Sequence, residues 1–391
     1  MRLLSSFICY SVFFIAIASA SSQERGPTPT TPEQIRAAID KLGDLDYAAR
    51  MAAGRTIRRA PTAPAVTALL QAVSEHADGY VRFRALTLLT GYNDPRTVDA
   101  MTSAMTSPND RLREVAYGYF EINPNPALAP KLLAALDKEE GEFVRPALIR
   151  ALAAIPKDPK VADVLMRDAM RGVDYFRSTV IEAIGDYKVT AAMPRLVEIA
   201  KLEGPLQDDA ATAIGKIGDK NQLGILAALQ QSAPKETQPA IAAAICLMGT
   251  NCSSHIGYLE KTLKFADTYP GYQELLRGAA AGLGNIARQG NEEALRILFD
   301  VGIPSQDPVR APVTLAIGLV ALRNTPLMLK TLQARPDQAG AVGIVAEAFD
   351  MLEEDLEEER FFVAVRKAYW AAPDGSPTRK LCEALINKLD F

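Results

Sequence analysis

Few side chains in this chain of 391 residues are of a type that carries acid–base or metal chemistry, since it has only two His and four Cys. The densest group is Cys246, Cys252 and His255, which lie in one short segment. A structural zinc site usually takes four ligands with a C-x₂-C spacing, and this segment lacks that spacing. In an oxidising compartment Cys246 and Cys252 are better suited to a disulfide across the turn, which leaves Cys382 over.

Sequence motifs of common enzymes are absent. The chain contains no G-x-S-x-G, H-E-x-x-H or Walker-type loop. Gly282 and Gly284 fall in a repeated segment and do not follow a predicted strand, so they do not indicate dinucleotide binding. The sequence therefore predicts a protein that is not an enzyme, with no catalytic residue, no cofactor and no metal site.

The overall composition excludes two further classes. Hydrophobic residues make up 48% of the chain, which is enough for a core and argues against wholesale disorder. The 43 Lys and Arg against 47 Asp and Glu leave a net charge of −4, whereas nucleic-acid binding favours a basic excess. The charge balance therefore argues against a nucleic-acid partner.

The first twenty residues resemble an export signal. Arg2 precedes an apolar run from Leu3 to Ala18, and small residues occupy the positions that a signal peptidase inspects in Ala18-Ser19-Ala20. We predict a signal peptide at 1–20, with an uncleaved anchor as the alternative, and no membrane span after cleavage. The protein is then exported, to the periplasm or the extracellular space. Residues 21–31 are rich in Pro and Thr and are predicted to form an extended polar linker.

An eight-residue frame recurs at intervals of roughly 32 residues through the rest of the chain. Two examples are RFRALTLL from Arg82 and RSTVIEAI from Arg177. Most copies carry apolar or small residues at offsets −1, +3 and +7, which form one stripe on a helix. A small residue at +6 in many copies would let a neighbouring helix approach closely. The copies begin at Arg50, Arg82, Arg113, Arg145, Arg177, Gln207, Gln238, Arg277 and Arg310, with a weaker one near Gly343.

A second apolar stretch follows each frame after about half a period, and turn residues such as Gly91-Tyr92-Asn93-Asp94-Pro95 separate the two. Neither helix of such a pair can bury its apolar stripe alone, so the copies must stack. The predicted fold is therefore all-α: an α-solenoid of about ten helix pairs at 32–370, closed by a C-terminal capping helix at 371–391.

The frame and its turns, as in Asp307-Pro308-Val309-Arg310, resemble the short bacterial HEAT-type repeats found in phycobilisome lyases. This resemblance implies a HEAT-repeat scaffold, because most members of the family bind other proteins. The alternative that it implies is a HEAT-like lyase or isomerase acting on a prosthetic group attached to protein.

The Arg column that opens the frame has two interpretations. It could form a basic stripe for an acidic ligand. Alternatively, each Arg pairs with an acid three or four residues upstream of the adjacent copy's Arg, and the resulting ladder fixes the register of the stack. We favour the ladder, which Gln207 and Gln238 would interrupt.

Partner binding is predicted at two places. Residues of the framed helices at offsets +1, +2 and +5 would line the inner curve of the stack. They are polar and mixed in sign in the first half and small and neutral in the second, so we expect a protein or peptide partner and no nucleic acid. A 39-residue spacing before Arg277 also inserts a loop with two Tyr residues, and such insertions often bind partners. The candidates are Arg84, Arg150, Glu182, Asp208, Tyr269 and Tyr272. The alternatives are a solvated inner face and a loop whose Tyr rings pack on the preceding helix, and the oligomeric state stays open. The acidic run 353–359 is predicted to start a solvated helix.

Overall fold

The computed structural model describes residues 29–269, 271–352 and 354–391. The predicted signal peptide at 1–20 and residues 21–28 of the predicted linker lie outside these residues. Within them the chain forms 22 α-helices joined by short connections, four of which contain a 3-10 turn, and it forms no strand. This arrangement confirms the predicted all-α solenoid.

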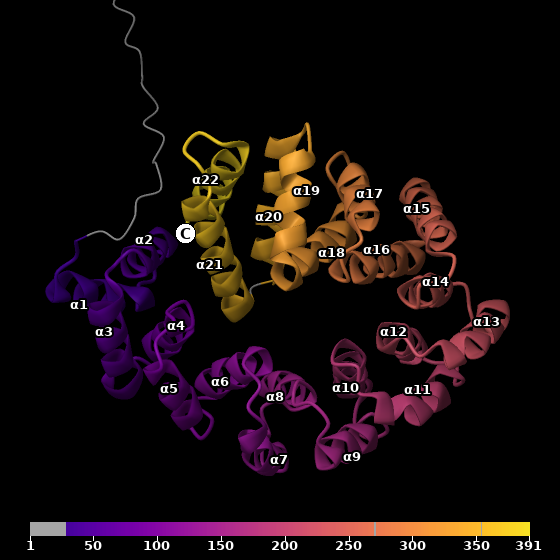
Figure 1. Ribbon diagram of the computed structural model, residues 1–391, viewed down its shortest axis with the longest axis horizontal. Helices are drawn as coiled ribbons and strands as arrows, with labels where there is room; N and C mark the ends of the chain where they lie inside the picture. The colour runs from indigo at the N-terminus through magenta and orange to yellow at the C-terminus, as the bar shows by residue number, and fades with distance from the viewer. Residues whose placement is uncertain (1–28, 270, 353) are drawn as a thin grey trace, which may run out of the picture.

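The nine framed segments from Arg50 to Arg310 fall in the even-numbered helices α2 to α18, which line the inside of the curved stack in Figure 1. The inner helices are α2 (Tyr47–Arg58), α4 (Gly79–Leu89), α6 (Asp110–Ile122), α8 (Val144–Ala153), α10 (Asp174–Asp186), α12 (Gln207–Ile217), α14 (Gln238–Leu247), α16 (Gln273–Arg288) and α18 (Arg310–Arg323).

The second apolar stretch of each copy forms an outer helix. The outer helices are α3 (Thr62–Glu75), α5 (Arg96–Ala104), α7 (Ala129–Leu136), α9 (Pro159–Asp168), α11 (Met193–Ala200), α13 (Leu223–Ser232), α15 (Cys252–Thr268), α17 (Glu292–Gly302) and α19 (Thr325–Ala334). The ends of the stack are formed by α1 (Pro32–Asp40), α20 (Gln338–Leu352), α21 (Asp355–Ala371) and α22 (Pro377–Leu389).

Side-chain caps fix where several helices begin. Thr31 caps α1 in a reciprocal pair with Gln34, and Pro32 occupies the first turn, where no amide donor is needed. The carboxylates of Asp46 and Asp78 accept hydrogen bonds from backbone N–H groups at the starts of α2 and α4. In those two copies, the acid that precedes the frame therefore serves as a helix cap.

Inner helices approach one another closely where a small residue faces a glycine. A Cβ atom added to Gly215 of α12 would lie 2.8 Å from both the Cβ and the carbonyl oxygen of Ala244 of α14. The same relationship brings Gly185 of α10 against Ala213 of α12. The small residues at offset +6 therefore permit the tight stacking that the sequence predicted.

The Arg column does not act mainly as a charge ladder. Its common contact is with backbone carbonyls at the end of the preceding outer helix, which otherwise lack a partner. Arg82 donates to the carbonyl of Val73, Arg177 to Ala169 and Gln207 to Ala200. Gln238 likewise donates to Ala233. Glutamine makes the same bond as arginine, so the two Gln residues continue the column. Among the described residues, Arg113 pairs with Glu139 and Arg310 with Glu347, but neither acid stands three or four residues before the next residue of the column. Arg177 and Arg277 pair with the acids three residues upstream in their own copies, so these ion pairs do not form the predicted ladder between copies.

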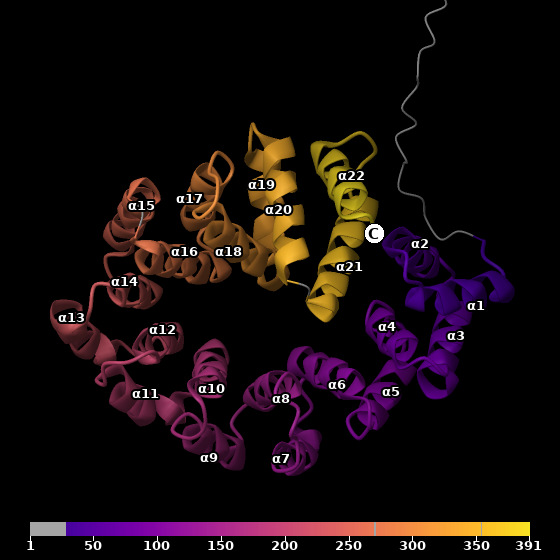
Figure 2. The same cartoon turned by 180° about the vertical axis from the view of Figure 1, so that it is seen from behind.

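The stack curves until its two ends meet. Figures 1 and 2 both place α21 and α22 beside the first helices, so the solenoid is a closed ring. Leu356 of α21 is buried within the same apolar cluster as the N-terminal helices, where it lies over Gly118 of α6. The sequence predicted a cap at an open end and a solvated acidic helix start. In the structure, however, Glu357 and Glu359 are buried at the ring closure.

Within the described residues, no single helix has both the length and the apolarity needed to cross a membrane. The consecutive helices α18 and α19, which meet at a sharp bend, are together long and apolar enough to meet this criterion by length and composition alone.

Candidate partner-binding site

A cavity of about 940 Å³ lies where the ring closes. Its walls are the inner faces of α2, α4, α6 and α8 on one side and α20, α21 and the end of α22 on the other. Basic side chains of the first group, including Arg84 and Arg150, face acidic side chains of α21. Two large apolar side chains among the lining residues, Tyr47 and Phe143, are 62% and 79% exposed. The cavity therefore combines charges of both signs with exposed aromatic surface.

An ion pair beside this cavity joins the two ends of the helix stack. Arg58, the last residue of α2, donates three hydrogen bonds to the carboxylate of Glu359, at 2.7, 2.9 and 3.1 Å, and both side chains are buried. The guanidinium of Arg58 also lies over the ring of Phe362, and its carbonyl accepts a hydrogen bond from Arg366. Nearby, Arg84 of α4 pairs with Asp355 at the start of α21.

A second cross-ring contact centres on Glu121, at the end of α6. Its buried carboxylate accepts hydrogen bonds from the Tyr187 hydroxyl at 2.6 Å and from Arg323 of α18 at 2.9 Å, and a third from Arg150 of α8. Burial alone would raise the pKa of Glu121, but the charges of Arg323 and Arg150 offset it and hold the pKa below its usual value. Glu121 thus stays ionised and joins α6, α8 and α18 to Tyr187, the residue that follows α10.

A third contact lies further along the ring. Asp186 of α10 pairs with Lys216 of α12 at 2.7 Å and with Arg288 of α16 at 3.0 Å. Burial opposes ionisation of Asp186, but the two cations outweigh it and lower the pKa of this carboxyl. The cross-ring contacts therefore join α10 to α16, α6 to α18, and α2 and α4 to α21.

Acidic side chains that line the cavity, on α6 and around the start of α21, have the opposite shift. Burial raises the pKa of Glu358 to about 7, even though Arg84 lowers it. Burial and the neighbouring Glu357 likewise raise the pKa of Glu354, and burial with the charge of Glu354 raises that of Glu114. These carboxylates lose hydration without gaining a full counter-charge.

The predicted partner-binding residues fall in three separate places. Arg84 and Arg150 both line the cavity, and each already pairs with an acid of this chain. Glu182 lies 3.6 Å from Arg288 in the other half of the ring, and Asp208 is exposed at the start of α12. Tyr269 and Tyr272 lie on the far loop between α15 and α16, where both rings contact Phe265.

Sequence reasoning missed the acids and arginines that close the ring. Glu121, Arg323 and Glu359 sit at ends of the repeated frame or outside it, so no periodic signal marks them. Phe143 directly precedes α8 and does not belong to the apolar stripe of that helix. A large apolar residue outside the stripe could have been recognised in the sequence as a candidate binding residue.

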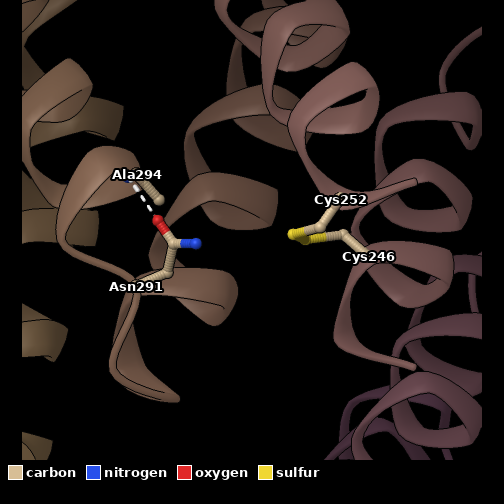
Figure 3. The surroundings of a disulfide bond; sticks show 4 residues. All are labelled: Cys246, Cys252, Asn291 and Ala294. Atoms are coloured by element: carbon tan, nitrogen blue, oxygen red, sulfur yellow. Dashed lines mark hydrogen bonds between the residues drawn. A yellow bond between two sulfur atoms is a disulfide. The ribbon is translucent and has the colours of Figure 1, made fainter. Parts of the chain in front are cut away.

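The structure joins Cys246, near the end of α14, to Cys252, the first residue of α15, in a disulfide. Figure 3 shows this bond facing the start of α17, where Asn291 accepts a hydrogen bond from the backbone N–H of Ala294. Cys382 in α22 is a buried free thiol, and burial raises its pKa to about 11. No group of three or more His, Cys, Asp or Glu in the described residues is placed to hold a metal ion.

Similarity to known proteins supports the repeat assignment at the N-terminal end. Residues 35–120 match the family model of HEAT repeats. A search of the curated proteins found no match.

Among solved structures, a Kap121p mutant is 14% identical with a TM-score of 0.40, and the match covers 92% of this chain and 45% of that one. Importin beta is 12% identical with a TM-score of 0.36, covering 92% and 58%. A chain from a study of the interaction between cadherin and beta-catenin is 13% identical with a TM-score of 0.31, covering 91% and 83%. The chain thus spans about half the length of the first two.

Proposed function

We propose that this chain is a non-enzymatic, exported HEAT-type scaffold that binds a protein or peptide partner on its inner curve, at the cavity where the ring closes. Solenoids of stacked helix pairs commonly present concave surfaces to protein partners. The observation that carries the proposal is the cavity itself, which is lined by charges of both signs and has Phe143 79% exposed. Exposed aromatic side chains beside charged groups are typical of protein-binding surfaces.

Two observations support the proposed export. Residues 1–20 have the pattern of a signal peptide. A disulfide between Cys246 and Cys252 is stable in oxidising compartments and rare in the cytosol. The mass of the protein recovered from the exported fraction tests this part, because retention of residues 1–20 would indicate an anchor.

The binding site is tested with exposed side chains whose replacement leaves the core intact. Partners captured from the exported fraction are compared for the natural chain, for Phe143→Asp and Tyr47→Asp, and for Tyr175→Asp as the matched control. Tyr175 is 58% exposed on α10 and does not line the cavity. We expect one specific partner to be lost from the two cavity variants and kept by the control. Equal capture by all four proteins contradicts the inner-curve site, and prosthetic-group transfer by the pure protein contradicts the non-enzymatic assignment.

A further inference from the structure

A second surface lies outside the cavity, where the repeat spacing lengthens to 39 residues. The extra residues extend the outer helix α15 to 17 residues, compared with 10 in α13 and 11 in α17. About two additional turns therefore project beyond the length of the neighbouring outer helices. Four aromatic side chains of α15 and the following loop stay substantially exposed: Tyr258, Phe265, Tyr269 and Tyr272.

Three of these rings form a fixed cluster. The centroid of Phe265 lies 4.7 Å from that of Tyr269 and 5.1 Å from that of Tyr272. Tyr258 lies two helical turns before Phe265 and so shares its face of α15. The Tyr rings therefore do pack on the preceding helix, yet Tyr269 and Tyr272 remain 52% and 43% exposed. Rings ordered in this way lose little conformational entropy when a partner covers them.

A groove of about 340 Å³ runs beside this cluster. Its walls come from α15, from the start of α16 and from the connection into α14. The lining residues are Lys235, Gln238, Tyr258, Lys261, Thr262, Phe265 and Leu275.

The charge of the groove has a single sign. Its described lining contains two lysines and no carboxylate, although the whole chain carries a net charge of −4. Within residues 29–269, 271–352 and 354–391, no ion pair involves Lys235 or Lys261. Both side chains are exposed, so their ammonium groups are available to a ligand. By contrast, Lys264 on the same helix pairs with Glu260.

We propose that this aromatic groove binds a short acidic segment of a partner protein, with an aromatic or aliphatic side chain packed between Tyr258 and Phe265 and carboxylates paired with Lys235 and Lys261. The apolar floor provides most of the buried area, and the two ammonium groups select for negative charge. This surface is separate from the cavity, so the proposal does not depend on the function proposed for the inner curve.

Three labelled peptides test the proposal by fluorescence anisotropy on the full folded protein. The first has a central Phe between two pairs of Asp, the second replaces Phe by Gly, and the third replaces Asp by Lys. We expect only the first to bind, with an affinity that falls as salt is raised. Binding that is equal for all three peptides, or absent for the first, overturns the proposal. A single-stranded oligothymidylate probes the alternative of nucleic-acid stacking, and binding tighter than the first peptide also overturns it.

Variants assign the binding to the groove. The double variant Lys235→Glu with Lys261→Glu, and separately Phe265→Ser, are expected to weaken binding of the first peptide by at least about tenfold. The control variants Lys160→Glu and Tyr175→Ser alter an exposed lysine of α9 and an exposed tyrosine of α10, and they are expected to bind as the natural chain does. Loss of binding in the controls, or its retention in the groove variants, contradicts the assignment.

Discussion

Arg58 and Glu359 lie 301 positions apart in the chain, and their side chains form a buried ion pair with a closest separation of 2.7 Å. A stack of repeats whose ends point apart could not make this contact. The pair belongs to a series that continues through Glu121 with Arg323, 202 positions apart, and Asp186 with Arg288, 102 positions apart. The number of residues between the two partners falls along this series because the second half of the ring lies antiparallel to the first half.

Removing one member of the buried pair should destabilise the fold. Glu359→Ala leaves the Arg58 guanidinium buried without its counter-charge, so we expect the free energy of unfolding to fall by about 3–5 kcal/mol in chemical denaturation. The matched control is Glu274→Ala, because Glu274 and Arg277 form an ion pair in which both side chains are more than half exposed. The control should change stability by under about 1 kcal/mol. Similar losses in both variants would contradict the structural importance of the buried pair.

The close approach of α12 and α14 should make Gly215 intolerant of a side chain. Gly215→Ala places a methyl group against the backbone of Ala244, which cannot rotate away, so we expect a loss of about 1–3 kcal/mol in the free energy of unfolding. Gly343→Ala is the control, since Gly343 lies inside α20 and an added Cβ meets nothing within 4 Å. There the lower flexibility of alanine should stabilise the protein by about 0.5–1 kcal/mol. Stabilisation of both variants would refute the close contact.

Stability should depend on pH through Glu358. Its pKa is about 7 in the folded protein and 4.5 in the reference state, so between these values the folded state holds a proton that the unfolded chain has released. The free energy of unfolding should therefore decrease as pH rises across this window.

Glu358→Gln removes that ionisation. We expect the variant to be more stable than the natural chain at pH 8, by about 1–3 kcal/mol, and nearly equal to it at pH 4. Denaturant unfolding between pH 4 and 8 measures the difference, with the exposed Glu203→Gln as a control. If the free energy of unfolding depends on pH in Glu358→Gln as it does in the natural chain, Glu358 does not titrate in this range.

The cysteines should behave differently before and after unfolding. In protein lacking residues 1–20, we expect almost no alkylation at pH 8 in the native state, because Cys382 is buried and its pKa is about 11. Denaturation without reductant should expose one thiol, and denaturation with reductant should expose three. Reduction of Cys246–Cys252 should also lower the free energy of unfolding by about 2 kcal/mol, the value for so short a loop. Three reactive thiols in the unreduced protein would contradict the disulfide.

Local periodicity predicted the helix pairs well, because each inner helix repeats the same burial pattern as its neighbour. Arg50 through Arg310 mark the nine inner helices, and the turn residues mark their ends. The role of the column itself was misjudged. Two copies of the frame have Gln in place of Arg, and Gln207 and Gln238 make the same hydrogen bond without carrying a charge. The presence of Gln at this position already indicated a donor to carbonyl groups.

The ring closure could not be predicted from the same pattern. It depends on the summed rotation of many repeats, and small angular differences accumulate along the stack. The residues that make it, such as Glu121 and Arg323, occur singly and carry no period. The acidic start of α21 was therefore interpreted as solvated, although Glu359 is 2% exposed.

Joining the ends changes how the array should unfold. In an open solenoid each repeat depends only on its neighbours, so terminal repeats can fray while the middle persists. Here the terminal helices share a core through Leu356, and their loss would break contacts with α4 and α6 as well as with their own neighbours. The ring should thus unfold as one cooperative unit. Loss of the contact between α21 and the N-terminal helices should lower the stability of all repeats together.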